Sequence, residues 1–210
     1  MIAIAALGVF AAVVAFVAVN GHNAKGSASA TSDASAGPTP STTQDGRDLS
    51  QVSNEEMETV VAANPDVVPM RLALVERYLH AADGEQTADS KKAQLQRALF
   101  HAGEAAARAT TVADRARALR YLGWTTALLT DPTKGAGLLE QSLAEEPGNP
   151  DALWFLASVR FDKLNDPAAA KPLLEQLLAT PVDDTQKQAV QAKLDQVNAA
   201  LAASSNASAN

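Results

Sequence analysis

The residues of this chain that could do chemistry are three histidines, and neither their spacing nor their neighbours indicate a reactive site. His22, His80 and His101 lie far apart in the sequence, and no two of them have the spacing of metal ligands on a helix. None lies near a candidate nucleophile. The chain contains no cysteine, which excludes thiol redox chemistry, cysteine-based zinc or haem sites and a lipid anchor on cysteine. We therefore expect His80 and His101 to be ordinary helix residues.

Paired carboxylates and a Gly-Ala-Gly triplet are the remaining candidates for chemistry. The acids at residues 145–146 and 183–184 lie at expected helix ends, where solvated carboxylates are common. The triplet at residues 135–137 lies at the start of an expected helix, where small residues permit close packing, and it does not form a phosphate-binding loop. The sequence thus predicts a protein that is not an enzyme and that has no metal, cofactor or small-molecule substrate.

The elements that carry these residues are organised by an internal repeat. Residues 130–147, TDPTKGAGLLEQSLAEEP, align with residues 165–181, NDPAAAKPLLEQLLATP, at an offset of about 35 positions. The identical pairs are Asp131/Asp166, Pro132/Pro167, Leu138/Leu173, Leu139/Leu174, Glu140/Glu175, Gln141/Gln176 and Leu143/Leu178. A period of roughly 34 residues with a helix–turn–helix pattern is typical of tetratricopeptide repeats, and the chain resembles that family.

Each copy contains the residues that a pair of stacked helices needs. Asp131 and Asp166 are good N-caps, and the proline after each fits the first helical position, where its missing N–H would have no partner anyway. The helix before Asp166 is apolar on more than one face, as expected for a helix stacked between neighbours. Family positions are matched by Leu119, Leu122, Gly123, Leu139, Pro147, Trp154, Ala157, Phe161, Ala170, Leu174 and Pro181. The alternative is a set of generic helical hairpins.

We expect an all-α, TPR-like solenoid of about three helical hairpins at residues 51–203. A more polar helix at residues 184–203 is expected to be its cap, because solenoids end in a helix with a polar outer face. Residues 21–50 are mostly Ser, Ala, Thr, Gly and Pro, which cannot bury enough surface to fold, so they are predicted to be a disordered linker. Residues 204–210 are predicted to be a disordered tail by the same reasoning.

The N-terminal segment, residues 1–20, is predicted to be a transmembrane anchor or signal-anchor. Residues 2–19 form an uninterrupted run of 18 apolar and glycine residues. That length is just enough to cross a bilayer core of ~30 Å. A cleaved signal peptide is the alternative, since small residues at positions 27–30 resemble a cleavage site.

The first repeat carries a narrower resemblance. A capping box at Ser53 and Glu56 predicts a helix start. The residues that follow resemble the opening of the periplasmic repeat domain of c-type cytochrome biogenesis factors, through Met57, Val60, Val61, Asn64, Pro65, Asp66, Leu72, Leu74, Arg77 and Tyr78. That resemblance implies a membrane-anchored periplasmic domain that holds apocytochrome c for haem ligation. The chain departs from that family by having one membrane segment and a long Ser/Ala linker.

Charge is distributed unevenly along the chain. The net charge of -7 argues against a dedicated nucleic-acid binder. Residues 86–130 are nevertheless basic between acidic flanks, with Lys91, Lys92, Arg97, Arg108, Arg115, Arg117 and Arg120 against Asp89, Glu104 and Asp114. These residues are either a solvated helix face or an anchor for an acidic segment of a partner.

The family resemblance implies a binding groove, because the first helix of each pair lines the concave surface of such repeats. It assigns partner binding to Leu72, Glu76, Leu79, Arg117, Arg120, Trp124, Leu128, Phe155, Val159 and Asp162. Trp124 lies within a turn or two of Arg117 and Arg120, and this composition is typical of a binding hot spot whose two Arg meet acids of the partner. The alternative is that Trp124 packs against a neighbouring helix.

The sequence therefore predicts a membrane-tethered interaction module in an exported compartment. We expect a single-pass protein of the cell membrane with its repeat domain on the extracytoplasmic side. Its expected partner is a protein or peptide, in the form of a helical segment, and not a nucleic acid. The leading expectation is a role in holding apocytochrome c or assembling a cytochrome c maturation complex. An envelope scaffold that recruits other proteins is the second expectation, and an enzyme with an unrecognised site is the third.

Overall fold

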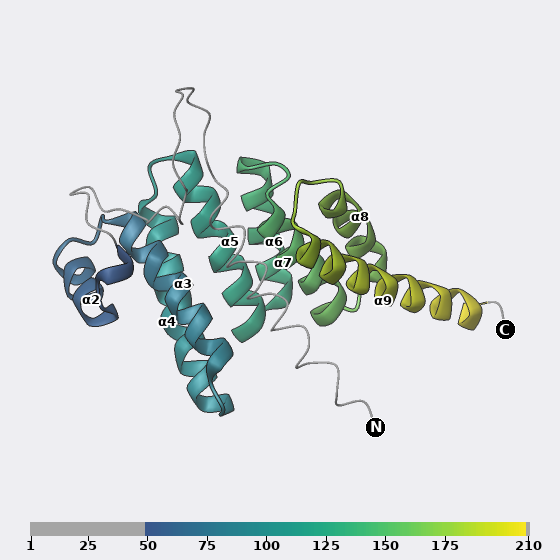
Figure 1. Cartoon of the computed structure of the whole chain (residues 1–210), viewed down its shortest axis with the longest axis horizontal. Coiled ribbons are helices and arrows are strands. Elements are labelled where there is room, and N and C mark those ends of the chain that lie inside the picture. The colour runs from purple at the N-terminus through teal and green to yellow at the C-terminus, as the bar shows by residue number, and fades with distance from the viewer. Residues whose placement is uncertain (1–48, 209–210) are drawn as a thin grey trace.

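A computed structural model of the chain describes residues 49–208, in which the regular elements are all helices (Figure 1). They are η1 (Leu49–Gln51), α2 (Asn54–Ala63), α3 (Val68–Gly84), α4 (Ala88–Arg108), α5 (Val112–Leu129), α6 (Pro132–Glu145), α7 (Pro150–Ser158), η2 (Val159–Lys163), α8 (Pro167–Leu178) and α9 (Asp184–Ser208). The predicted anchor at residues 1–20, residues 21–48 of the predicted linker at residues 21–50, and residues 209–210 lie outside the described residues.

The helices stack as consecutive pairs along the long axis of the domain (Figure 1). The pairs are α3 with α4, α5 with α6, and α7 and η2 with α8, and each is joined by a short connection. The helices of the first and second pairs also contact the pair that follows, and among the first helices α5 contacts both α3 and α7. Helix α2 lies at one end of the stack and α9 at the other (Figure 1). The prediction of an all-α stack of helical hairpins is confirmed over these residues.

The helix starts are those that the sequence predicts. Oδ1 of Asp131 accepts hydrogen bonds from two backbone N–H groups of the following turn at 2.9 and 3.0 Å, and Oδ1 of Asp166 accepts one at 3.0 Å. At the start of α2, Oγ of Ser53 accepts from the N–H of Glu56 at 3.2 Å, while the Glu56 carboxylate accepts from the N–H of Ser53 at 2.9 Å. Side chains thus satisfy donors that a helix start leaves free.

Glycines set the unusually close approach of α5 and α6. A Cβ placed on Gly135 would lie 2.6 Å from the carbonyl oxygen of Gly123 and 2.6 Å from Cβ of Ala127. A Cβ placed on Gly123 would lie 2.9 Å from the carbonyl oxygen of Gly135 and 2.9 Å from Cγ of Leu139. The expectation of close packing at the Gly-Ala-Gly triplet is therefore confirmed at Gly135, whereas Gly137 has no such neighbour within 4 Å.

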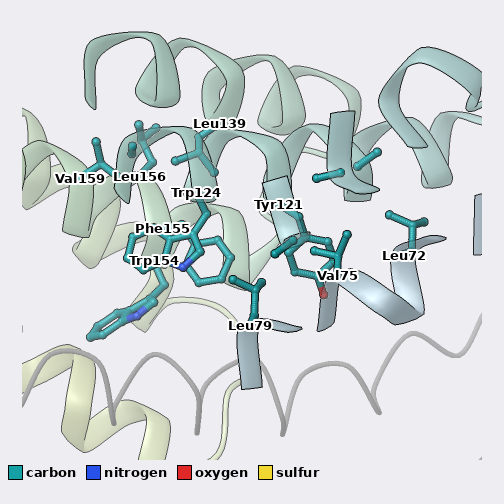
Figure 2. Packing of buried hydrophobic residues seen from close by; sticks show 14 of the residues in the cluster. Leu72, Val75, Leu79, Tyr121, Trp124, Leu139, Trp154, Phe155, Leu156 and Val159 are labelled. Carbon is teal, nitrogen blue, oxygen red and sulfur yellow. The ribbon is translucent and has the colours of Figure 1, made fainter. Parts of the chain in front are cut away.

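The core runs the length of the stack. Trp154, Tyr121 and Phe155 are fully buried there, together with Leu139 from α6 (Figure 2). Trp154 retains only 1% of its surface, which confirms its position inside the repeat. Aromatic side chains bury the largest apolar areas. Tyr121 reaches α3, Phe155 is stacked on a ring of α5, and Trp154 lies beside α9, so the three rings pack at successive contacts along the stack.

The ends of the domain differ from the sequence prediction. Leu49 is buried, and its carbonyl oxygen accepts a hydrogen bond of 2.6 Å from the Arg77 guanidinium, so the fold begins before residue 51. At the other end α9 continues to Ser208, past the predicted boundary at residue 203. Alanine favours the helix, and the hydroxyls of Ser204 and Ser205 both donate to the carbonyl of Leu201 at 2.9 Å. The helix therefore propagates through a segment that composition alone marks as disordered.

Candidate interaction surface on the first helices

All the residues predicted to bind a partner lie on the first helices of the three pairs. Helix α3 carries Leu72, Glu76 and Leu79, and α5 carries Arg117, Arg120, Trp124 and Leu128, whereas Phe155 is on α7 and Val159 and Asp162 are on η2. Because α5 contacts both α3 and α7, the structure brings these residues to adjacent helices. The structure thus places the predicted residues on the first helices, and a groove that they line stays a prediction.

Most of the apolar members of this set are buried. Leu72, Phe155 and Val159 are fully enclosed, and Leu79 and Trp124 retain 8% and 4% of their surface. The rings of Trp124 and Phe155 are stacked, with centroids 4.7 Å apart and planes at 12° (Figure 2). Trp124 therefore packs against a neighbouring helix, as the alternative interpretation has it. A role of these residues in partner binding stays a prediction.

An ion pair with a shared carboxylate joins α3 to α5. Nη2 of Arg117 donates to Oε1 of Glu76, and the hydroxyl of Tyr121 donates to the same oxygen at 2.7 Å. The side chains of Glu76 and Arg117 are 32% and 34% exposed, so the pair is reachable from solvent. Burial raises the pKa of Tyr121 and so does the Glu76 carboxylate, and the hydroxyl therefore stays protonated and keeps donating.

Arg117 remains charged throughout the accessible pH range. Burial acts to lower the pKa of its guanidinium, but the carboxylate of Glu76 and the Tyr121 side chain outweigh burial, and the net pKa is raised. The cluster of Glu76, Arg117 and Tyr121 is thus a fixed, partly exposed ion pair at the junction of two repeats.

Arg120 makes the corresponding connection from α5 to the start of α7, but it is buried. Its Nη1 donates to Oδ1 of Asn149 at 2.9 Å, and its Nη2 lies 3.5 Å from Oδ2 of Asp151. The side chains of Arg120 and Asp151 are only 7% and 5% exposed. The expectation that Arg120 meets an acid of the partner is corrected, because its guanidinium is enclosed in the domain and is held by Asp151 and Asn149.

Two other arginines of the basic region also form ion pairs with acids of this domain. Arg115 on α5 makes a bidentate contact with Glu145 on α6, at 2.9 and 3.0 Å. Arg108 on α4 lies 2.7 Å from Glu104 and 3.5 Å from Asp66. Much of the positive charge of residues 86–130 is therefore neutralised by acids of the same fold, which leaves less of it for an acidic partner segment.

His80 and His101 lie on helices, as the sequence predicts, and His101 makes one contact that the sequence did not predict. His80 is exposed on α3, and His22 lies outside the described residues. His101 on α4 is buried, and its Nε2 lies 2.9 Å from Oε1 of Glu58 on α2. The same oxygen accepts from the hydroxyl of Tyr78 on α3 at 2.6 Å. Residues so distant in sequence carry no spacing signal that could have revealed this contact.

The described residues contain neither a metal-binding group of acids and histidines nor a membrane-spanning helix. Between residues 49 and 208, the acids and histidines form no group of three or more that could hold a metal ion. In the same range, the helices include none with the length and apolarity needed to cross a membrane.

Comparison with known proteins agrees with the repeat. Residues 130–194 match a tetratricopeptide repeat family model, and this range runs from the turn before α6 into the first half of α9. Searches of curated proteins and of solved structures return no match. Tetratricopeptide repeats are generally interaction modules without catalytic activity of their own. The match and the stack of paired helices together support a tetratricopeptide repeat protein.

Proposed function

We propose that this domain binds a helical segment of another protein across its first helices, α3, α5 and α7. The observation that carries the proposal is the ion pair of Arg117 with Glu76, which lies at the junction of two repeats with about a third of each side chain exposed. An acid of a partner helix shares Arg117 there, and a base of the same helix shares Glu76. This is the helix-in-groove mode of recognition, with charges that fix the register of the helix.

In this mode of binding the charged residues contact the partner, whereas the apolar residues stabilise the fold. Partly exposed ion pairs contribute little stability, about 0–1 kcal/mol each, so their exchange with partner charges costs the domain little. The buried, stacked rings of Trp124 and Phe155 hold α5 against α7 instead and keep these two helices at a fixed distance. Binding on a preformed surface avoids the entropy cost of ordering it.

We propose further that the domain is tethered to a membrane on its extracytoplasmic side. The support is the apolar run at residues 2–19, followed by a linker that lets the domain search the membrane surface. Apocytochrome c is the leading ligand, because residues 57–78 resemble the opening of the repeat domain of cytochrome biogenesis factors. The match of residues 130–194 to a general repeat model favours an envelope scaffold as the second candidate.

Substitution of Arg117 tests the binding proposal, and Arg115 supplies a matched control. Both are on α5, both are in an ion pair, and their side chains are 34% and 37% exposed, but Arg115 faces α6 of its own pair. The probe is a synthetic C-terminal helical segment of apocytochrome c. We expect Arg117→Ala to slow association and to weaken its salt dependence, while Arg115→Ala leaves both unchanged. Equal effects of the two variants would contradict the binding surface.

The tether has a separate test. The full chain is expected to stay in the membrane fraction after carbonate extraction, because residues 2–19 can span the bilayer. Recovery of a soluble form that begins between residues 21 and 34 would show that the segment is a cleaved signal peptide.

A further inference from the structure

The amino group of Lys193 on α9 is enclosed by the third repeat. Only 4% of the residue is exposed, and lysine is rarely buried to this extent unless it is paired. Its Nζ lies 2.6 Å from Oδ2 of Asp162 and 5.7 Å from the ring centroids of both Trp154 and Phe161. A cation near two aromatic rings and beside a carboxylate has the surroundings that proteins use to bind alkylammonium groups.

The pocket is built by an irregular turn of the third pair. Trp154 comes from α7, whereas Phe161 and Asp162 come from η2, a five-residue π-helix that continues α7. A π-turn carries more residues per turn than an α-helix and so changes the direction in which the following side chains leave the helix. Such turns are rare and frequently mark functional sites. Here the turn provides both the second ring and the carboxylate of the pocket.

Helix α9 shows what kind of ligand this pocket accepts. Its buried residues follow one helical face: Gln186, Val190, Lys193, Leu194 and Val197. A cation therefore stands inside an otherwise largely apolar stripe. Enclosing a lysine carries a desolvation cost, so a buried ion pair is often no more stable than well-packed apolar residues in place of both partners, whereas loss of one partner leaves the charge of the other uncompensated. The lysine thus adds selectivity for its pocket more than it adds stability.

Helix α9 packs on the third pair mainly through its first half. It is joined to α8 by residues 179–183 only, and its last fully buried side chain is Val197. Residues 202–205 are exposed, and the C-terminal part of the helix extends away from α8 (Figure 1). The helix is therefore held mainly over its first half.

We propose that Trp154, Phe161 and Asp162 form a recognition pocket for a lysine-bearing amphipathic helix, and that α9 is its resident occupant, which a partner helix of the same pattern displaces. The pattern is an apolar residue, a lysine three positions later, an apolar residue next to it and another three positions on, as in Val190, Lys193, Leu194 and Val197. The proposal rests on the proposed function only in the class of partner, a helix. A tethered occupant acts at an effective concentration in the millimolar range for a short connection, so α9 screens the pocket against weak ligands.

The test uses the full chain and a fluorescent peptide of residues 184–203. Lys193→Glu places a second negative charge beside Asp162 and is expected to release α9, whereas Lys187→Glu makes the same change at a half-exposed position of the same helix. We expect the peptide to bind the Lys193→Glu protein at least about tenfold more tightly than the wild type or the Lys187→Glu protein. A peptide carrying Lys193→Met is expected to bind about tenfold more weakly than one carrying Lys187→Met.

Each result decides the proposal. Equal binding of the peptide by the two protein variants, or equal binding of the two altered peptides, would overturn it, because the pocket would not then select a lysine. Release of α9 alone removes only the helical circular dichroism signal of that helix. Loss of the helical signal of the whole domain in Lys193→Glu would overturn the proposal and would make α9 a fixed part of the fold. A heterodimer of the wild-type and Lys193→Glu proteins would support the pocket and identify a second copy as the source of the helix. None of these results bears on Arg117, which is tested with a different ligand.

Discussion

Substitution of Gly135 by alanine probes the close contact of α5 and α6 with a single methyl group. The added Cβ would lie 2.6 Å from the Gly123 carbonyl oxygen, 2.6 Å from Cβ of Ala127 and 2.7 Å from its backbone nitrogen. Two of these three atoms are backbone atoms, which cannot rotate away as a flexible side chain could. The two helices must therefore separate, and the layers on both sides of them must adjust.

The magnitude follows from two opposing contributions. Overpacking a well-packed interior costs typically about 1–3 kcal/mol, and contacts this short with backbone atoms place the cost at the upper end. Replacing glycine by alanine inside a helix returns roughly 1 kcal/mol. We therefore expect Gly135→Ala to lower the free energy of unfolding by about 2 kcal/mol.

Gly137→Ala is the matched control, because it makes the same change two residues later on α6. A Cβ at Gly137 meets nothing within 4 Å, so only the helix preference remains, and stability should rise by up to about 1 kcal/mol. Urea unfolding followed by far-ultraviolet circular dichroism measures both variants. If Gly135→Ala is neutral, or if it stabilises the protein as Gly137→Ala does, α5 and α6 are not in this contact.

Three further predictions concern the interior. Trp154→Ala should cost about 3–5 kcal/mol in urea unfolding, as a large-to-small change in a packed core; a loss under about 1 kcal/mol would place Trp154 outside the core. Trp124→Ala should lower the free energy of unfolding by a similar amount, because its ring is stacked on Phe155. An unchanged melting temperature would mean that the Trp124 side chain is not part of the core. Burial acts to raise the pKa of Glu58, but hydrogen bonds from Tyr78 and His101 outweigh it and lower that pKa below 4.5. The stabilisation by this carboxylate is present above pH 4.5 and is lost as the pH falls below it. Glu58→Gln should therefore make the free energy of unfolding less dependent on pH in the acid range, whereas Glu55→Gln, on the exposed side of α2, should not.

The repeat and its helix starts could be predicted from the sequence because their signals are local. The aspartate and proline at 131–132 and 166–167 act through their own backbone and through the next turn, and the structure has these caps where the sequence puts them. The position of Trp154 in the core follows in the same way from the apolar pattern of its own helix. The small residues at 135–137 indicated close packing, and the structure contains it at Gly135, against Gly123.

The candidate site could be predicted only in part, because burial and ion pairing depend on residues distant in the sequence. Arg117 and Arg120 share a helix face, yet Arg117 forms a partly exposed ion pair with Glu76. Arg120 is buried and is held by Asp151 and Asn149. Helical spacing cannot distinguish these environments. Lys193 is a charged residue within the apolar stripe of the last helix, and this pattern alone was a weak indication of a special environment. Its pocket depends on the π-turn of η2, which composition does not reveal.

Photocrosslinking in cells tests most directly whether the first helices bind a partner. His80 is exposed on α3 one turn beyond Glu76, and Phe100 is 59% exposed on α4, the second helix of the same pair. A photoreactive phenylalanine analogue is placed at one position or the other in the full chain. We expect a discrete crosslinked protein from position 80 and none from position 100. The absence of a crosslinked protein from position 80, or the same products from both positions, would contradict this expectation.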